Sequence, residues 1–226
     1  MLDNGAELIF TYQNERLKKS LLRLVSDEER LVECDVAKDE SIAQAFDTIL
    51  DKFGKIDGIV HAIAFANKDE LAGDIMNSSR AGYALAQDIS AYSLIAVSKY
   101  AVKLLNNPAS IVTLTYFGSE RAIPNYNVMG GVAKAALEAN VRYLARDMAK
   151  YGVRVNAISA GAVKTLAVTG VKDHGDLLRI SEERTVDGKS VTTKEIGGAA
   201  AFLVSDLSTG GVVGDTIYVD KGVHLI

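Results

Sequence analysis

Short apolar runs and longer segments of helical periodicity alternate along this chain. Six runs rich in β-branched residues are typical of buried parallel strands, and they lie at residues 7–12, 30–34, 58–62, 110–115, 154–158 and 216–219. Four longer segments carry apolar residues at helical spacing, and they lie at residues 41–53, 85–105, 132–150 and 195–205. Strands that alternate with helices in this way predict a parallel sheet that is covered on both faces.

We therefore expect one α/β domain over residues 1–226, a doubly wound parallel sheet of the Rossmann-like kind. Such a sheet usually opens with a strand, a glycine-rich turn and a helix whose N-terminus holds a dinucleotide pyrophosphate. Here residues 2–6 are typical of a helix end followed by a turn at Gly5, and no G-x-G-x-x-G cluster lies near residue 1. We expect that the first βα unit is lacking and that the two strands that would flank it are unpaired on one edge.

Composition and charge exclude several classes of protein. Hydrophobic residues make up 48% of the chain, charged residues 24%, and the net charge is −4 with acids and bases interleaved, which argues against a nucleic-acid-binding surface. Cys34 is the only cysteine, so that no intramolecular disulfide can form and a cytoplasmic location is expected. Three histidines and one cysteine offer no metal-ligand spacing. We also find neither a signal peptide nor an apolar run long enough to cross a membrane.

Residues 113–134 contain the candidate chemistry: Tyr116 at a predicted strand end, Tyr126 after it, and Lys134 on the next predicted helix. A lysine ammonium can lower the pKa of a phenol and bind a cofactor ribose, while the phenol hydrogen-bonds a carbonyl oxygen that gains negative charge. Two other tyrosine–lysine pairs have a similar spacing, Tyr92 with Lys99 and Tyr143 with Lys150. Spacing alone is therefore a weak indication, because such pairs are typical of helix surfaces.

Five segments resemble the bacterial enoyl-[acyl-carrier-protein] reductases of the short-chain dehydrogenase/reductase superfamily. They are HAIAFANKDELAGD (61–74), LAQDISAYSL (85–94), ERAIPNYNVMG (120–130), AKAALEANVRYLARDMAKYGVRVNAISAGAVKTLA (133–167) and AAFLVSDLSTG (200–210). The NYNVMG and ISAG-x-x-[KR]-TLA motifs distinguish this family from other short-chain dehydrogenases. The resemblance implies that the chain reduces the trans-2 double bond of an acyl chain on acyl carrier protein, with NADH or NADPH, in fatty acid biosynthesis.

The resemblance also implies roles for individual residues. Tyr126 would hydrogen-bond the thioester carbonyl and stabilise the enolate, Lys134 would bind the nicotinamide ribose, and Tyr116 would be a second catalytic tyrosine beside the nicotinamide. Ala66 would line the acyl site together with the two tyrosines. The implied cofactor-binding residues are Gln13, Asp35, Val36, Ile63, Lys134, Val163, Lys164, Thr165, Leu166 and Ala167.

Cofactor choice depends on the residues that follow the first predicted strand, where the family selects the adenosine ribose. Gln13 and Asn14 are uncharged there, whereas a 2′-phosphate would need basic partners. We therefore expect NADH rather than NADPH, although Arg16 and Lys18 are close in sequence.

The chain departs from the family at Gly130-Gly131, where the family has one glycine. The extra residue would rotate Lys134 by about 100° on a regular helix. Such a rotation would move Leu137 and Tyr143 away from the core, so we expect a π-bulge near the glycines and Lys134 still facing Tyr126. A second additional glycine lies at Gly210-Gly211.

Two alternatives stay open. The chain could be an inactive relic of the enzyme that cannot bind dinucleotide, or a reductase of ketones or alcohols. Apolar residues on more than one face of the segments 85–105 and 132–150, together with the resemblance, favour a homotetramer.

Overall fold

The computed structural model describes residues 1, 5–71, 73–123, 126–163, 174–205 and 210–226. The strands are β1 Phe10–Tyr12, β2 Leu31–Glu33, β3 Ile56–His61, β4 Leu105–Thr115, β5 Val153–Ala160 and β6 Thr216–Val219. The α-helices are α1 Glu15–Leu21, α2 Asp39–Phe53, α3 Arg80–Gln87, α4 Ser93–Ala101, α5 Lys134–Met148, α7 His174–Glu183 and α8 Thr193–Val204. Two π-helical segments are η5 Asp88–Tyr92 and η7 Val128–Ala133, and a short 3-10 turn, η6, spans Phe117–Ser119.

All paired strands run parallel, as the sequence predicts, but they form two sheets. One has two strands in the order β1-β2, and the other has four in the order β3-β4-β5-β6. In the described part of the chain no strand pairs with the second edge of β1 or of β3.

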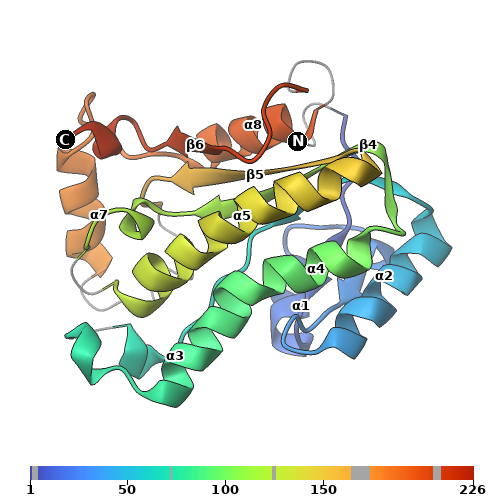
Figure 1. Cartoon of the computed structure of the whole chain (residues 1–226), viewed down its shortest axis with the longest axis horizontal. Helices are drawn as coiled ribbons and strands as arrows, with labels where there is room; N and C mark the ends of the chain where they lie inside the picture. Colours follow the sequence, from blue (N-terminus) through green and yellow to red (C-terminus); the bar gives the residue numbers. More distant parts are fainter. Residues whose placement is uncertain (2–4, 72, 124–125, 164–173, 206–209) are drawn as a thin grey trace.

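Helices cover both faces of the larger sheet (Figure 1). On one face, α2, α4 and α5 pack in a core that includes Ile111 and Val155. On the other face, α8 packs against Val112 and Ile158. Neighbouring residues of β4 thus serve opposite faces, as expected for a strand in a covered parallel sheet. Val32 and Cys34 from β2 and the loop after it belong to the first core, so the two sheets share it.

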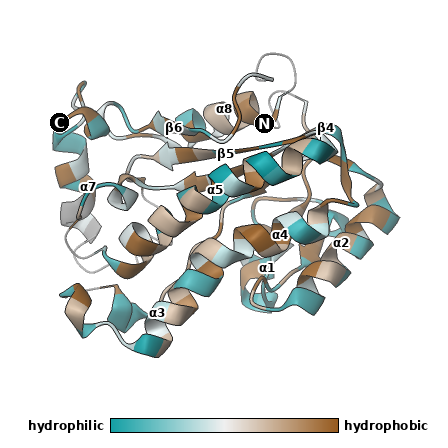
Figure 2. Ribbon diagram, viewed as in Figure 1, coloured by the Kyte–Doolittle hydropathy of each residue, from teal (hydrophilic) through white to brown (hydrophobic). Residues whose placement is uncertain are grey.

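The amphipathic pattern explains the helices that the sequence predicts. α2 buries Ile42, Ala45, Phe46 and Ile49, which lie on one stripe, and its remaining residues are mostly polar. Figure 2 shows the resulting mixture of hydrophilic and hydrophobic bands along α2 and α5. α8 begins at a capping box: the Glu195 backbone N–H donates to the Thr192 hydroxyl oxygen, and the Thr192 backbone N–H donates to the Glu195 carboxylate.

Three expectations about helices are wrong. The segment 85–105 is not one helix: it contains η5, ends as a helix at Ala101, and its last residue begins β4. Two helices, α1 and α7, were not predicted. Tyr143 is 70% exposed, so the buried face of α5 is formed by other residues, including Leu137 and Val141. No helix in the described ranges is long and apolar enough to cross a membrane.

Candidate active site

The predicted site residues gather at the carboxyl edge of the strands. Parallel strands all end at the same edge, which is where ligands bind in doubly wound sheets. The residues that follow strands at this edge are Gln13, Asp35, Val36, Ile63, Tyr116 and Val163. Lys164, Thr165, Leu166 and Ala167 lie outside the described residues.

Gln13 and Asp35 meet across β1 and β2. The Gln13 Nε2 donates to Asp35 Oδ1 at 3.3 Å, and the Asp35 backbone N–H donates to Ser41 Oγ at 2.8 Å. Lys18 is not directed to this pair, because its ammonium lies 2.6 Å from the Glu28 carboxylate. The pair therefore offers an amide and a carboxylate, which suit the hydroxyl groups of a ribose.

Tyr116 and Tyr126 form an edge-to-face pair, with ring centroids 5.2 Å apart and an interplanar angle of 71°. Burial raises the pKa of Tyr126 to about 12, and the neighbouring Tyr116 adds to this. Burial also raises the pKa of Tyr116, while the Arg184 cation opposes the shift. Both phenols are protonated at neutral pH and can donate a hydrogen bond to a carbonyl oxygen.

Lys134 is buried, with 5% of its surface exposed, and its Nζ donates to the Leu114 carbonyl oxygen at 2.7 Å. Burial lowers the pKa of Lys134 to about 8, and the Glu138 carboxylate opposes that shift. Glu138 in turn accepts a hydrogen bond of 2.5 Å from Thr115 Oγ1 at the end of β4. A lysine in this environment changes its charge near physiological pH, so a nearby carboxylate or ligand can set its state.

The chain between the second tyrosine and the lysine forms the π-helical segment η7, which confirms the predicted bulge. The Asn127 carbonyl oxygen accepts from both Gly131 N–H at 2.9 Å and Val132 N–H at 3.0 Å. A Cβ at Gly130 would lie 2.0 Å from the Tyr126 ring, so only glycine fits there. Among the described residues, no hydrogen bond joins Lys134 to Tyr126, and the facing of the two side chains stays a prediction.

Ala66, predicted to line the acyl site, is buried after β3. It belongs to a buried cluster with Val128 and Met129, against which Ala64 and Tyr126 pack. The structure thus brings together Tyr116, Tyr126 and the loop after β3.

Sequence reasoning missed several polar residues around this site. His61 is 2% exposed and lies between Thr113 Oγ1 at 2.9 Å and Ser93 Oγ at 2.8 Å. Burial, with the Lys134 charge as a second cause, lowers the pKa of His61 to about 3. Glu138 stands one helical turn after Lys134, and that spacing could have indicated it. Among the described residues, no group of three or more His, Cys, Asp or Glu is placed to hold a metal ion.

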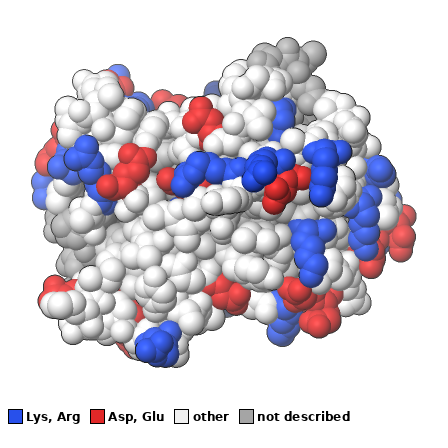
Figure 3. All heavy atoms as spheres, viewed as in Figure 1, with Lys and Arg blue, Asp and Glu red and all other residues white. Residues whose placement is uncertain are grey.

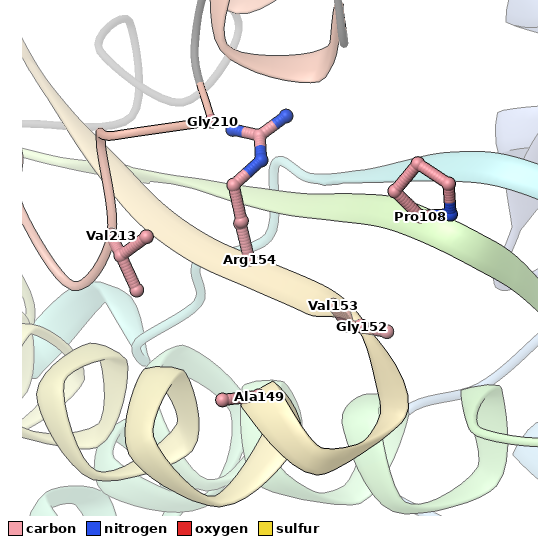
Figure 4. Close-up of a pocket in the computed structure, with 7 residues that line it drawn as sticks. All are labelled: Pro108, Ala149, Gly152, Val153, Arg154, Gly210 and Val213. Atoms are coloured by element: carbon pink, nitrogen blue, oxygen red, sulfur yellow. The ribbon is translucent and has the colours of Figure 1, made fainter.

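A hollow of about 400 Å³ lies at the opposite edge, where β4 and β5 begin (Figure 4). It is lined by Pro108, Ala149, Gly152, Val153, Arg154, Gly210 and Val213. The Arg154 guanidinium donates to the carbonyl oxygens of Leu203 and Ser205 at 3.1 and 3.3 Å. Because the tyrosines and Lys134 lie at the other end of the strands, this hollow is separate from the candidate site.

The fold and the motifs at its carboxyl edge define a reductase of the short-chain dehydrogenase/reductase type. The family model described as "Enoyl-(Acyl carrier protein) reductase" matches residues 1–224. The chain belongs to the enoyl-acyl-carrier-protein reductase family.

Individual relatives agree with this assignment. The enoyl-[acyl-carrier-protein] reductase [NADH] FabI of Enterococcus faecalis is 62% identical over 223 residues, which are 99% of this chain and 88% of the relative. The reductase of Staphylococcus aureus (strain MRSA252), named for NADPH, is 48% identical and is matched over 98% of this chain and 88% of its own length. The crystal structure of the Bacillus cereus reductase with NADP+ and indole naphthyridinone superposes with a TM-score of 0.93 at 48% identity, covering 98% of this chain and 87% of that one.

Proposed function

We propose that this chain reduces the trans-2 double bond of an enoyl thioester on acyl carrier protein with NADH, in fatty acid biosynthesis. The observation that carries the proposal is the edge-to-face pair of partly buried, protonated tyrosines at the carboxyl edge of the sheet, together with the buried Lys134 at the start of α5. Family membership favours this reaction over the reduction of a ketone or an alcohol. NADH supplies the hydride when it is bound.

The protein's own residues stabilise the charge that develops on the thioester. Addition of hydride at the β-carbon moves electrons onto the carbonyl oxygen and gives an enolate, which then takes a proton at the α-carbon. The Tyr126 phenol donates a hydrogen bond to this oxygen, and the Tyr116 ring packs edge to face against the Tyr126 ring. Both rings are partly buried, and this reduced contact with water strengthens the hydrogen bond to the developing oxyanion.

The residues at the two ends of the site fit a dinucleotide. Lys134 would bind the nicotinamide ribose, with Ile63 and Val163 along the same edge. Gln13, Asp35 and Val36 would hold the adenosine end. The Asp35 carboxylate beside Gln13 would repel a 2′-phosphate, which supports NADH over NADPH. The relatives carry both cofactor names, so the preference is tested by titration of each cofactor.

The assay follows NADH oxidation with a trans-2-enoyl thioester of acyl carrier protein. We expect that Tyr126→Phe lowers kcat by about 100- to 1,000-fold, the usual effect of removing one oxyanion donor. The matched control is Tyr143→Phe, because Tyr143 is 70% exposed on α5. If NADH fluorescence does not change on titration and the wild type shows no turnover, the chain is the inactive relic instead.

A homotetramer is part of the proposal. Tyr92 and Tyr143 are 45% and 70% exposed on the helical face, and Figure 3 shows a broad uncharged band across it. Exposed aromatic area of this kind is typical of subunit interfaces. Sedimentation equilibrium with Tyr143→Glu tests it, since a tetramer on this face would dissociate. A cytoplasmic location remains the expectation from the lone Cys34.

A further inference from the structure

The π-helical segment η5, Asp88–Tyr92, lies between the end of α3 and the start of α4, and its serine is tied to the loop after β3. The Phe65 backbone N–H donates to Ser90 Oγ at 2.9 Å, and the Ser90 hydroxyl donates to the Phe65 carbonyl oxygen at 3.0 Å. Ser90 has no exposed surface. One hydroxyl thus satisfies both backbone groups of a loop residue that no strand or helix pairs.

The loop that Ser90 holds reaches Tyr126. Ala66 belongs to a buried cluster with Val128 and Met129, and Ala64 and Tyr126 pack against that cluster. The side chain of Phe65 is 46% exposed, so the loop is anchored by its backbone rather than by burial of its largest side chain. Any shift of residues 64–66 would change the surface on which the Tyr126 ring rests.

η5 itself is fixed on two further sides. Asn140 Nδ2 of α5 donates to the Ala91 carbonyl oxygen at 3.0 Å. Ser93, at the start of α4, donates to the Ile89 carbonyl oxygen at 2.6 Å. The Ser93 Oγ also lies 2.8 Å from His61 Nε2, so the start of α4 is joined to the end of β3. The serine that holds the loop is therefore itself part of a rigid segment.

We propose that Ser90 is a positioning residue for the reduction, which holds residues 64–66 in the place where they support Tyr126. This role rests on the proposed function. Removal of the hydroxyl leaves the Phe65 N–H and C=O without partners and lets the loop move. A displacement of a reacting group by about 1 Å costs up to roughly a hundredfold in rate.

The test compares Ser90→Ala with Ser98→Ala. Ser98 is equally buried, on α4, but its hydroxyl has no hydrogen-bond partner in the described part of the chain, so its removal breaks no such contact. We expect Ser90→Ala to speed exchange of the Phe65 amide by more than about tenfold and Ser98→Ala to leave it unchanged. We also expect kcat to fall by roughly ten- to a hundredfold in Ser90→Ala alone, with little change in the KM for NADH.

Equal exchange and equal kcat in the two variants would overturn the proposal. If Ser90→Ala does not fold, hydrogen exchange of the wild-type protein alone tests the proposal. A Phe65 amide that exchanges as fast as an unpaired loop amide would contradict its hydrogen bond to Ser90. Absence of turnover in the wild type refutes the proposed function, whereas turnover that is insensitive to Ser90→Ala refutes only the role of Ser90.

Discussion

Deletion of one glycine from Gly130-Gly131 should stabilise the protein and keep Lys134 buried. The deletion removes the extra residue that η7 absorbs, so the chain can form a regular helix from Asn127 into α5. Tyr126 and Lys134 are then seven positions apart, which returns them to nearly the same helical face. The doubly used Asn127 carbonyl oxygen is replaced by single regular hydrogen bonds.

The expected size follows from helix propensity. A glycine in a helix interior costs about 0.5–1 kcal/mol relative to alanine, and the deletion removes one. At this chain length 1 kcal/mol corresponds to a shift in Tm of roughly 2–4 °C. We therefore expect Tm to rise by about 1–4 °C. Leu137 and Val141 on the buried face of α5 oppose any rotation of the helix, because burial of each is worth roughly 1.5–3 kcal/mol.

Scanning calorimetry of the deletion variant measures this, and Gly198→Ala is the matched control. Gly198 lies within α8, and a Cβ there meets nothing within 4 Å, so the substitution reports helix propensity alone. A fall in Tm for the deletion, with the usual gain for Gly198→Ala, would show that the π turn is the favoured conformation. Loss of NADH oxidation at raised Tm would show that Lys134 had left the site.

Three further outcomes follow from the charges of the site. Glu138→Gln should shift the alkaline fall of kcat/KM to lower pH. Lys134 must stay protonated to bind the cofactor ribose, its pKa is about 8, and the negative charge of Glu138 raises that pKa. An unchanged pH profile would contradict this expectation. His61 has a pKa of about 3 in the folded protein, below its unfolded value, so the free energy of unfolding decreases as the pH falls from about 6.5 towards 3. Between about pH 7 and 5 this decrease is about 2 kcal/mol. Denaturant unfolding of His61→Gln at both pH values should lack this part of the pH dependence. Gln13→Arg with Asn14→Lys should raise affinity for NADPH relative to NADH by calorimetry, because a 2′-phosphate gains cationic partners, and an unmoved ratio would place ribose selection elsewhere.

The sequence predicts all six strands because runs of β-branched residues are bounded by polar or glycine residues. It misplaces the boundary between α4 and β4, since Val102, Leu104 and Leu105 are as compatible with a helix as with a strand. α1 escapes prediction because its sequence ERLKKSL is mostly polar and buries no residue fully. Local periodicity cannot detect a helix that contributes so little to a core.

Some residues of the candidate site could likewise be predicted from the sequence, and others could not. Tyr116, Gln13 and Asp35 could be placed together because each follows a parallel strand, and such strands end at one edge. Ser90 and His61 could not, because their partners Phe65 and Thr113 are 25 and 52 positions away in sequence. A single polar residue in an apolar segment does not reveal what satisfies it until the fold brings the partners together.

The two sheets assign the two ends of the proposed cofactor site to different parts of the molecule. Gln13 and Asp35 follow strands of the two-stranded sheet, whereas Tyr116 follows β4 of the four-stranded one. In the described part of the chain no strand ladder joins β1 to β3, so the relative position of the two ends depends on the shared core beneath α2 and α4. In the described residues, side-chain packing rather than a backbone ladder therefore holds the two ends relative to one another. A dinucleotide that touches both ends would therefore add a restraint that the sheets lack, and its binding should be coupled to the stability of β1 and β2 more than to that of β4 and β5.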